Sequence, residues 1–288
     1  MKKMLNTLII FCMISVSCNL LMVNTVEAST SLTSSEETLL KNAFGISNTK
    51  DAVKELQIRV GGWVKDANYT GSPIRLVIDG IMGPNTRQAI KNFQSAYNIS
   101  ATGTINQTTL NTINSLESSD DSTSHFSWNE FRCKGSSTLT WNVWHEITNI
   151  TSEKALIKTI ADNRNISYTS LKWMYASQTE IKENVRRVMW RLEALRKKIG
   201  SKPINLTSGF RYWNYHFRSP NVYGGNTSNV TLNSMHLYGA AADIYVSGYS
   251  NTSLKNMAKT CGFTGGYSEG SFVHIDIRSD LGKSAWWQ

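Results

Sequence analysis

The sequence predicts a multidomain protein, in which a bundle of three short helices precedes a larger α+β domain. Helix-start signals recur three times in the first part of the chain, whereas the second part mixes one long amphipathic helix with short alternating strands. The chain has 288 residues, of which 40% are hydrophobic and 18% charged. This composition supports one large or two ordinary domains, and it excludes a disordered chain, a collagen-like chain and a disulfide-stapled miniprotein.

The three helix signals lie within residues 38–116. Asp51 can cap the first helix, and Gly-Pro at 83–84 opens the second, where the proline stands at the first helical position and its missing N–H costs nothing. Asn106 can cap the third. The Ser/Thr/Glu-rich stretch up to about Glu37 is expected to be mobile. The apolar residues expected to form the small core are Leu56, Ile90, Phe93 and Leu110.

The first 28 residues have the pattern of a secretory signal. Two lysines follow the initiator methionine, residues 8–23 are nearly all apolar, and small residues precede a cleavage site after Ala28. An uncleaved anchor is the alternative, but the polar residues in the run make a poor spanning helix. A lipid anchor at Cys18 is a further alternative, although the apolar run continues past it. We therefore expect a secreted protein with no stable membrane span after cleavage.

The formal net charge of +9 indicates a polyanionic partner, either nucleic acid, an anionic membrane or an acidic wall polymer. Cleavage after Ala28 removes two lysines and one glutamate, so the charge of the mature chain falls by one, to +8. Export makes nucleic acid an unsuitable partner. The charge therefore favours anionic wall polymers, and binding to them should weaken with salt.

Export also changes the cysteine count. Cys12 and Cys18 leave with the signal, and Cys133 and Cys261 remain. Two cysteines in an exported chain suggest one disulfide, with two buried free thiols as the alternative.

Residues 117–124 read as a flexible linker, because they are polar and have no apolar periodicity. The second domain follows at 125–288 and shows no repeating βαβ pattern, which favours an α+β fold. The charged face of its long helix is expected to be solvated, with a binding surface as the alternative. The elements expected in this domain are helices at 180–199 and 251–259, strands at 204–208, 242–246 and 272–278, and a glycine-rich turn at 265–270.

Three residues of the second domain form a suitable ligand set for a catalytic zinc. His236 precedes Asp243 by seven residues, and the alternating segment 272–277 places His274 and Asp276 on one strand face. Two histidines and one aspartate leave an open position for water, whose pKa the metal lowers. The remaining histidines are expected to be structural: His125, His145 and His216.

The first domain resembles the peptidoglycan-binding domain found on many wall enzymes, over roughly residues 40–116. Most of the matching residues are turn and core residues, so the resemblance identifies a fold rather than binding contacts. The matching segments are 53–57, 79–86, 89–94 and 102–103.

The second domain resembles the zinc D-alanyl-D-alanine carboxypeptidase family, whose catalytic domain is of the peptidase M15 type. The resemblance covers most of 125–280 and implies that His236, Asp243 and His274 bind one Zn2+ per chain. It also implies that Arg211 engages the substrate near the scissile bond, with a structural salt bridge as the alternative role of this arginine. The motifs that carry it are Ser-Gly-Phe-Arg at 208–211, Ser234-x-His236-x-x-Gly239-x-Ala241-x-Asp243, and Phe-Val-His-Ile-Asp at 272–276.

The general base is less defined. Related wall peptidases often place an acid three residues before the last histidine ligand, where this chain has Ser271. Asp276 is the first candidate for the base. Its alternative role is to bind the His274 imidazole or to form an ion pair with Arg278. Glu269 is the second candidate, with plain surface charge as the alternative.

These observations predict a secreted, wall-associated zinc peptidase that hydrolyses peptidoglycan stem peptides at D-Ala-D-Ala. An endopeptidase that cleaves a cross-link or another stem bond is one alternative, and a wall-binding protein without catalysis is another. The expected partners are peptidoglycan and anionic wall polymers, with no nucleic acid, and the chain is expected to be a monomer.

Overall fold

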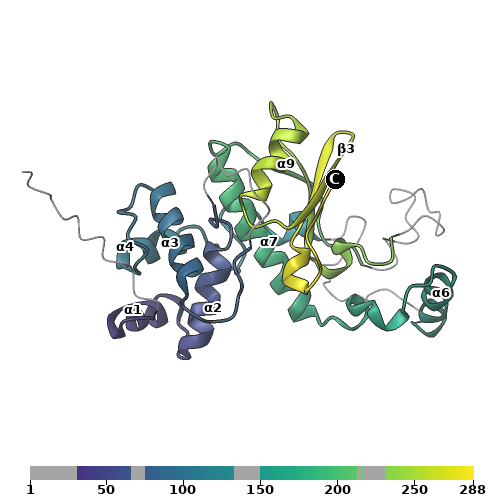
Figure 1. Ribbon diagram of the computed structural model, residues 1–288, viewed down its shortest axis with the longest axis horizontal. Coiled ribbons are helices and arrows are strands. Elements are labelled where there is room, and N and C mark those ends of the chain that lie inside the picture. The colour runs from purple at the N-terminus through teal and green to yellow at the C-terminus, as the bar shows by residue number, and fades with distance from the viewer. Residues whose placement is uncertain (1–30, 66–74, 133–149, 213–215, 217–230) are drawn as a thin grey trace, which may run out of the picture.

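The structure, a computed structural model, describes residues 31–65, 75–132, 150–212, 216 and 231–288 (Figure 1). The expected signal segment and Cys133 lie outside these residues. No helix within them is both long enough and apolar enough to span a membrane. The helices are α1 (Ser34–Phe44), α2 (Thr49–Val60), α3 (Pro84–Ala96), α4 (Gln107–Asn114), α5 (Trp128–Phe131), α6 (Ile150–Asn163), η1 (Tyr168–Ser170), η2 (Lys172–Tyr175), α7 (Gln178–Lys198), η5 (Met235–Tyr238), α9 (Asn251–Lys259) and η6 (Arg278–Leu281). The strands are β1 (Asn205–Ser208), β2 (Ala241–Tyr245), β3 (Gly265–Glu269), β4 (Phe272–Asp276) and β5 (Trp286–Trp287).

The three predicted N-terminal helices are present as α2, α3 and α4. Asn48 caps α2 by accepting a hydrogen bond from the backbone N–H of Asp51, so the cap lies three residues before the predicted one. Pro84 begins α3, and the side chain of Asn106 caps α4, both as predicted. The expected core residues are fully buried: Leu56, Ile90, Phe93 and Leu110.

The end of the stretch that was expected to be mobile, residues 34–37, is the first turn of α1. Thr33 and Glu36 form a capping box at its start. The buried Glu36 carboxylate accepts hydrogen bonds from Arg87 on α3 and, at 2.8 Å, from the backbone N–H of Ile105. Glu36 therefore ties α1 to the helices that follow it.

The predicted flexible linker, residues 117–124, is a closed turn. The N–H of Ser118 donates to the carbonyl of Ser122 at 2.9 Å, and the N–H of Ser124 donates to the carbonyl of Leu116 at 2.8 Å. Ser122 is only 2% exposed. Backbone hydrogen bonds thus take the place of the apolar contacts that the composition lacks. The domain boundaries themselves stay a prediction.

The second domain is built on a five-stranded sheet in the order β1-β2-β4-β3-β5. All pairs are antiparallel except β3 with β5. The predicted helices α7 and α9 and the predicted strands β1, β2 and β4 are confirmed within a few residues. Helices and strands are mixed as expected for an α+β domain.

The predicted glycine-rich turn at 265–270 is instead the strand β3. A Cβ atom on Gly265 would lie 2.2 Å from Nε of Arg278, and one on Gly266 would lie 2.4 Å from the carbonyl oxygen of His274. The glycines are therefore present because neighbouring groups approach the strand closely. Glycine content alone favoured a turn, so the prediction was wrong.

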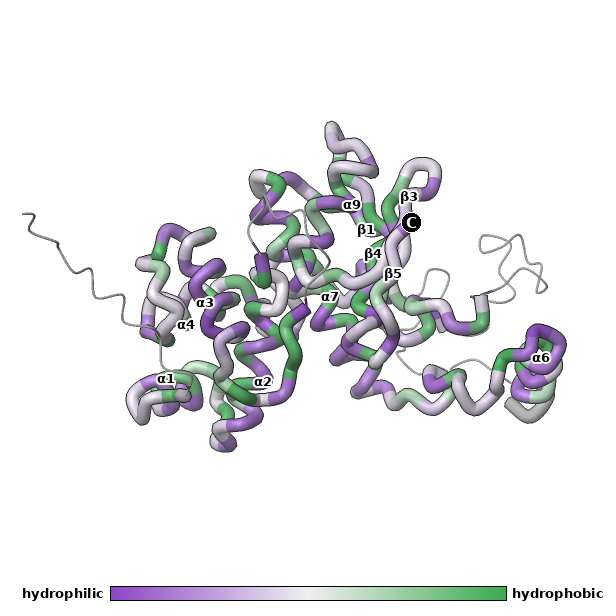
Figure 2. The backbone as a smooth tube through the Cα atoms, viewed as in Figure 1, coloured by the Kyte–Doolittle hydropathy of each residue, from purple (hydrophilic) through white to green (hydrophobic). Residues whose placement is uncertain are grey.

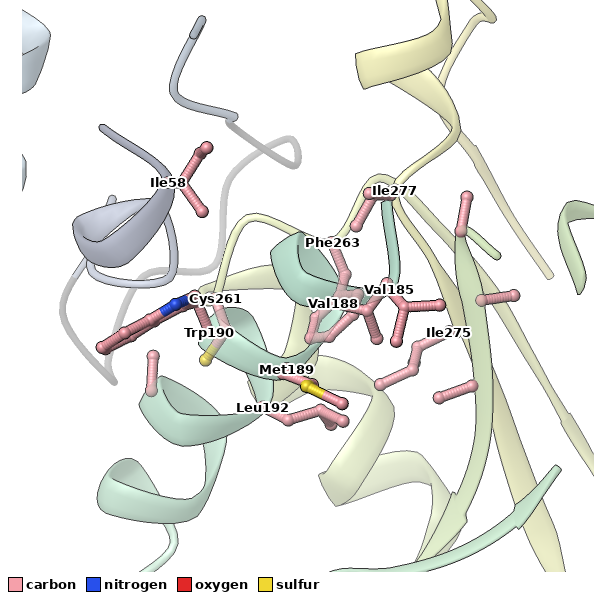
Figure 3. Close-up of a cluster of buried hydrophobic side chains, with 14 of the residues drawn as sticks. Ile58, Val185, Val188, Met189, Trp190, Leu192, Cys261, Phe263, Ile275 and Ile277 are labelled. Carbon is pink, nitrogen blue, oxygen red and sulfur yellow. The ribbon is translucent and has the colours of Figure 1, made fainter. Parts of the chain in front are cut away.

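Helix α7 lies between the N-terminal helices and the sheet (Figure 1). Hydrophobic and hydrophilic residues alternate along α2 and α7 (Figure 2). In Figure 3, Trp190 lies on the side of α7 that is towards Ile58 of α2, while Val188 lies on the side towards the strand residue Ile275. The helix thus contributes to one buried cluster that reaches into both parts of the protein.

The basic face of α7 is only partly solvated, in contrast to the prediction. Arg186 binds the carboxylates of Glu55 on α2 and Glu117, with its Nη1 atom 2.8 Å from Oε2 of Glu55. Gly62 follows α2, and a Cβ atom there would lie 2.5 Å from Cβ of Ala194. Ion pairs and close backbone contact therefore join the N-terminal helices to α7.

Cys261 carries a fully buried free thiol, beside Trp190 in Figure 3. Burial raises the pKa of this thiol, with a smaller opposing effect of Lys198. The structure does not support the expected disulfide at Cys261, and its expected partner lies outside the described residues.

Candidate active site

Three neighbouring elements bring His236, Asp243 and His274 together. His236 lies on η5, which ends at Gly239 with a φ of 68°, a left-handed conformation that suits glycine. The chain then enters β2, and Asp243 lies directly opposite His274 of β4 in the antiparallel register. Side chains of a cross-strand pair point to the same face, so the aspartate and the second histidine meet there.

The donor atoms of these residues form a small triangle. Nε2 of His236 lies 3.1 Å from Oδ1 of Asp243 and 3.2 Å from Nδ1 of His274. The third side, from Nδ1 of His274 to Oδ1 of Asp243, is 2.8 Å. All three residues are buried, and they are the group of potential metal ligands found in the described parts of the chain. The structure thus brings the three predicted ligands together.

The hydrogen bonds behind the two rings show that a cation fits between them. Nδ1 of His236 lies 2.6 Å from the carbonyl oxygen of Gly209, so it must donate its hydrogen there. Nε2 of His274 likewise donates to Oδ2 of Asp276 at 3.2 Å. The two remaining nitrogens then direct lone pairs at each other, which is repulsive unless a metal ion or a proton lies between them. Tetrahedral zinc with bonds near 2 Å separates its ligands by about 3.3 Å, close to the observed triangle.

The ionisation of the group suits a metal. Burial lowers the pKa of His236 to about 4, and the nearby Arg211 adds to this effect. Burial alone would raise the pKa of Asp243, but His236 and His274 lower it overall. Burial opposes protonation of His274, yet Asp243 and Asp276 raise its pKa overall. The negative charge that attracts a proton to this ring also attracts a metal cation.

Asp276 holds the His274 ring in place. Its Oδ1 atom accepts hydrogen bonds from the backbone N–H and Nε of Arg278 at 3.0 and 2.9 Å. Its Oδ2 atom accepts a hydrogen bond from Nε2 of His274 at 3.2 Å and one from Nη2 of Arg278 at 2.5 Å. Burial would raise the pKa of Asp276, but Arg278 and His274 lower it to about 2. This geometry fits the alternative role, a partner of His274 and Arg278.

Glu269 lies at the end of β3, where it pairs with Phe272 across the strands and is exposed. Neither Glu269 nor Asp276 is among the residues that line the cavity beside the two histidines. The structure therefore does not bring either candidate base to that cavity.

Arg211 is bonded to the metal-ligand group. Its Nη2 atom donates to Oδ2 of Asp243 at 2.6 Å, and its Nε atom donates to Oγ of Ser208 at 2.8 Å. Its backbone N–H donates to the carbonyl of His236 at 3.1 Å. The guanidinium also borders the cavity, as expected for a residue that engages substrate.

A cavity of about 610 Å³ opens beside the two histidines. Three of the residues that line it were not predicted from the sequence: Tyr267, Lys283 and Trp286. Tyr267 pairs directly with His274 across the strands, and the two rings stack at 4.8 Å. Recognising β3 as a strand would have identified Tyr267, whereas no pattern in the C-terminal residues indicates Lys283.

Comparisons with known proteins agree with this geometry. Residues 164–276, which include the three predicted ligands, match the family Peptidase M15. Residues 50–113 match the family Putative peptidoglycan binding domain. The zinc D-Ala-D-Ala carboxypeptidase of Streptomyces albus G is 30% identical over 215 residues, which cover 74% of this chain. The match spans 65% of that relative, slightly less than two thirds of its length. The part of the chain that holds the His-Asp-His group therefore resembles the family Peptidase M15, and the helical N-terminal region resembles a putative peptidoglycan-binding domain.

Proposed function

We propose that the protein is a secreted zinc peptidase that removes the terminal residue from peptidoglycan stem peptides ending in D-Ala-D-Ala. The cavity beside the His-Asp-His group carries the proposal. Three cationic side chains line it, those of Arg211, Arg278 and Lys283, and no acidic side chain is among its lining residues in the described part of the chain. Such a cavity suits a peptide that ends in a carboxylate.

His236, Asp243 and His274 would hold the metal. Zinc bound there would supply a Lewis acid that lowers the pKa of a water molecule and polarises the scissile carbonyl. The protein keeps both imidazoles in the tautomer that this requires. Gly209 fixes the His236 ring through its carbonyl oxygen, and Asp276 fixes the His274 ring.

Arg211 is proposed to act on both the ligand and the substrate. One Nη atom holds Asp243, while the guanidinium borders the cavity and is 15% exposed. A fixed positive charge there stabilises negative charge that develops on the scissile carbonyl oxygen.

The two carboxylates that were candidates for the general base receive different assignments. We assign Asp276 to positioning His274, because both of its oxygens are hydrogen-bonded and the side chain is fully buried. Glu269 receives no role in the reaction, since it is exposed and outside the cavity lining.

The N-terminal helices and the charge are proposed to keep the enzyme at its substrate. The match to a putative peptidoglycan-binding domain supports attachment of residues 38–116 to the wall. The net charge of +8 expected after removal of 1–28 would add attraction to anionic wall polymers.

The proposed function is tested by digesting purified sacculi with the mature, zinc-loaded protein and with a His236→Ala variant. Mass spectrometry should show stem peptides shortened by one D-alanine with the wild type alone. Fragments released by cleavage of cross-links would instead indicate an endopeptidase. Equal release by both proteins, or none by the zinc-loaded wild type, would contradict a peptidase that uses this site.

A further inference from the structure

The three cations that line the cavity differ in what they already bind. Arg211 donates hydrogen bonds from Nη2 to Asp243 and from Nε to Ser208. Arg278 donates hydrogen bonds from Nε and Nη2 to the buried Asp276. The positive charge of each arginine is therefore already balanced by a carboxylate of the protein.

Lys283 differs from both arginines. Its Nζ atom lies 5.3 Å from the centroid of the Tyr238 ring, and no hydrogen bond or ion pair of this ammonium is found with the described residues. The backbone of the lysine is fixed, because its N–H donates to the carbonyl of Arg278 at 3.1 Å. The ammonium thus has donors to offer at a defined place on the cavity wall.

The surroundings of Lys283 favour an anion. The side chain is half-buried, and burial, together with the charge of Arg278, lowers the pKa of its ammonium. A carboxylate bound between these cations would offset the repulsion, and partial burial would strengthen the attraction.

We propose that Lys283 binds the free C-terminal carboxylate of the substrate and so makes the enzyme select peptide ends. This inference rests on the proposed function and names the group that would distinguish a carboxypeptidase from an endopeptidase. A peptide that continues beyond the scissile bond, or ends in an amide, offers no carboxylate at this place. Lys283 is therefore the residue proposed to select the carboxylate, whereas Arg211 holds Asp243 beside the scissile bond and Arg278 holds Asp276.

Binding and cleavage test the two proposals separately. Binding is measured by calorimetry on the zinc-loaded protein, with a D-Ala-D-Ala-type peptide whose scissile amide is replaced by a ketomethylene group. The analogue is used as its free acid and as its C-terminal amide. The variants are Lys283→Met, Lys283→Arg and, as a control with the same loss of charge, Lys158→Met on the exposed surface of α6.

The wild type and Lys158→Met should bind the free acid about 10- to 100-fold more tightly than the amide. Lys283→Met should lose this preference by weakening the acid alone, and Lys283→Arg should retain most of it because it keeps the charge. The inference is overturned if the wild type binds both forms equally or neither form. It is also overturned if Lys283→Met weakens acid and amide by the same factor or leaves both unchanged.

Cleavage of the corresponding natural peptide tests the proposed function. A wild type that prefers the acid analogue but does not cleave the peptide would contradict the peptidase and leave the carboxylate site standing. Cleavage of acid and amide peptides with the same kcat/KM would support the peptidase and overturn the role of Lys283.

Discussion

Arg211 and Asp243 are joined by a 2.6 Å hydrogen bond from Nη2 to Oδ2. The other oxygen of the same carboxylate, Oδ1, faces His274 at 2.8 Å and His236 at 3.1 Å. One oxygen of the carboxylate thus belongs to the triangle of potential metal ligands, and the other binds a residue of the cavity wall. In the proposed function, the Asp243 side chain therefore links the residue that engages substrate to the metal site.

Removing Arg211 should weaken the metal site as well as catalysis. The Arg211→Met variant leaves one oxygen of the buried Asp243 without its donor, so we expect the zinc affinity to fall about 10- to 100-fold. Competition with a chromogenic chelator measures this affinity. Lys283→Met provides the comparison, because it touches no ligand and should bind zinc as the wild type does. Unchanged zinc affinity in Arg211→Met would contradict the role of the shared carboxylate.

The two carboxylates considered as bases should respond differently to neutralisation. Asp276→Asn loses the ion pair with Arg278 and weakens the hold on the His274 ring, so kcat/KM should fall at least about tenfold and zinc affinity should fall with it. Glu269→Gln should stay within about twofold, since the side chain lies outside the cavity lining. Steady-state kinetics on one defined peptide compares them. A larger loss in Glu269→Gln would reverse these assignments.

Acid should destabilise the N-terminal helices through Glu36. Burial would raise the pKa of this carboxyl, but Arg87, Ile105 and Thr33 lower it from 4.5 to about 2. A lowered pKa in the folded state stabilises the protein fully above 4.5 and loses this effect as the pH falls towards 2. The stabilisation amounts to at most about 3 kcal/mol.

Denaturant unfolding of the wild type and of Glu36→Gln measures this effect. The difference between them should be largest near neutral pH and should shrink below about pH 4.5. Glu37→Gln, which changes the less buried neighbour, is the control and should show a smaller difference. A difference that stays constant between neutral pH and pH 3 would contradict the ion pair as its cause.

Close packing after α2 should make Gly62 intolerant of a side chain. A Cβ atom there would lie 2.5 Å from Cβ of Ala194 and 3.0 Å from Cα of Arg191, so Gly62→Ser should cost about 1–3 kcal/mol. Gly83→Ser is the matched control, since no atom lies within 4 Å of its Cβ position and serine is a good N-cap for α3. Thermal melting compares the two. Equal melting temperatures would contradict a tight contact between α2 and α7.

Local patterns predicted the central parts of the second domain. The apolar periodicity identified α7, and the alternation of residues 272–276 identified β4 and the face that bears His274. Asp243 and His274 meet because β2 and β4 are neighbours in the sheet, and η5 with its turn at Gly239 brings His236 to them. Short motifs were sufficient to predict these ligands, because the spacing of the residues within each motif is set by one strand and one turn.

Features that depend on distant partners were not predictable. Glu36 is buried because Arg87 reaches it from α3, and residues 117–124 are ordered partly through Glu117 and Arg186. Gly265 of β3 is required by the side chain of Arg278. Each of these contacts joins residues that are far apart in the chain, so local composition suggested a mobile stretch, a linker and a turn.

The central claim, that this chain is a zinc peptidase acting at its His-Asp-His group, is tested most directly by the mass of the product. A defined stem pentapeptide ending in D-Ala-D-Ala is incubated with the zinc-loaded protein and with His236→Ala. We predict a tetrapeptide that has lost one D-alanine with the wild type, and intact pentapeptide with the variant. An intact pentapeptide with the wild type, or the same tetrapeptide with both proteins, would contradict the claim.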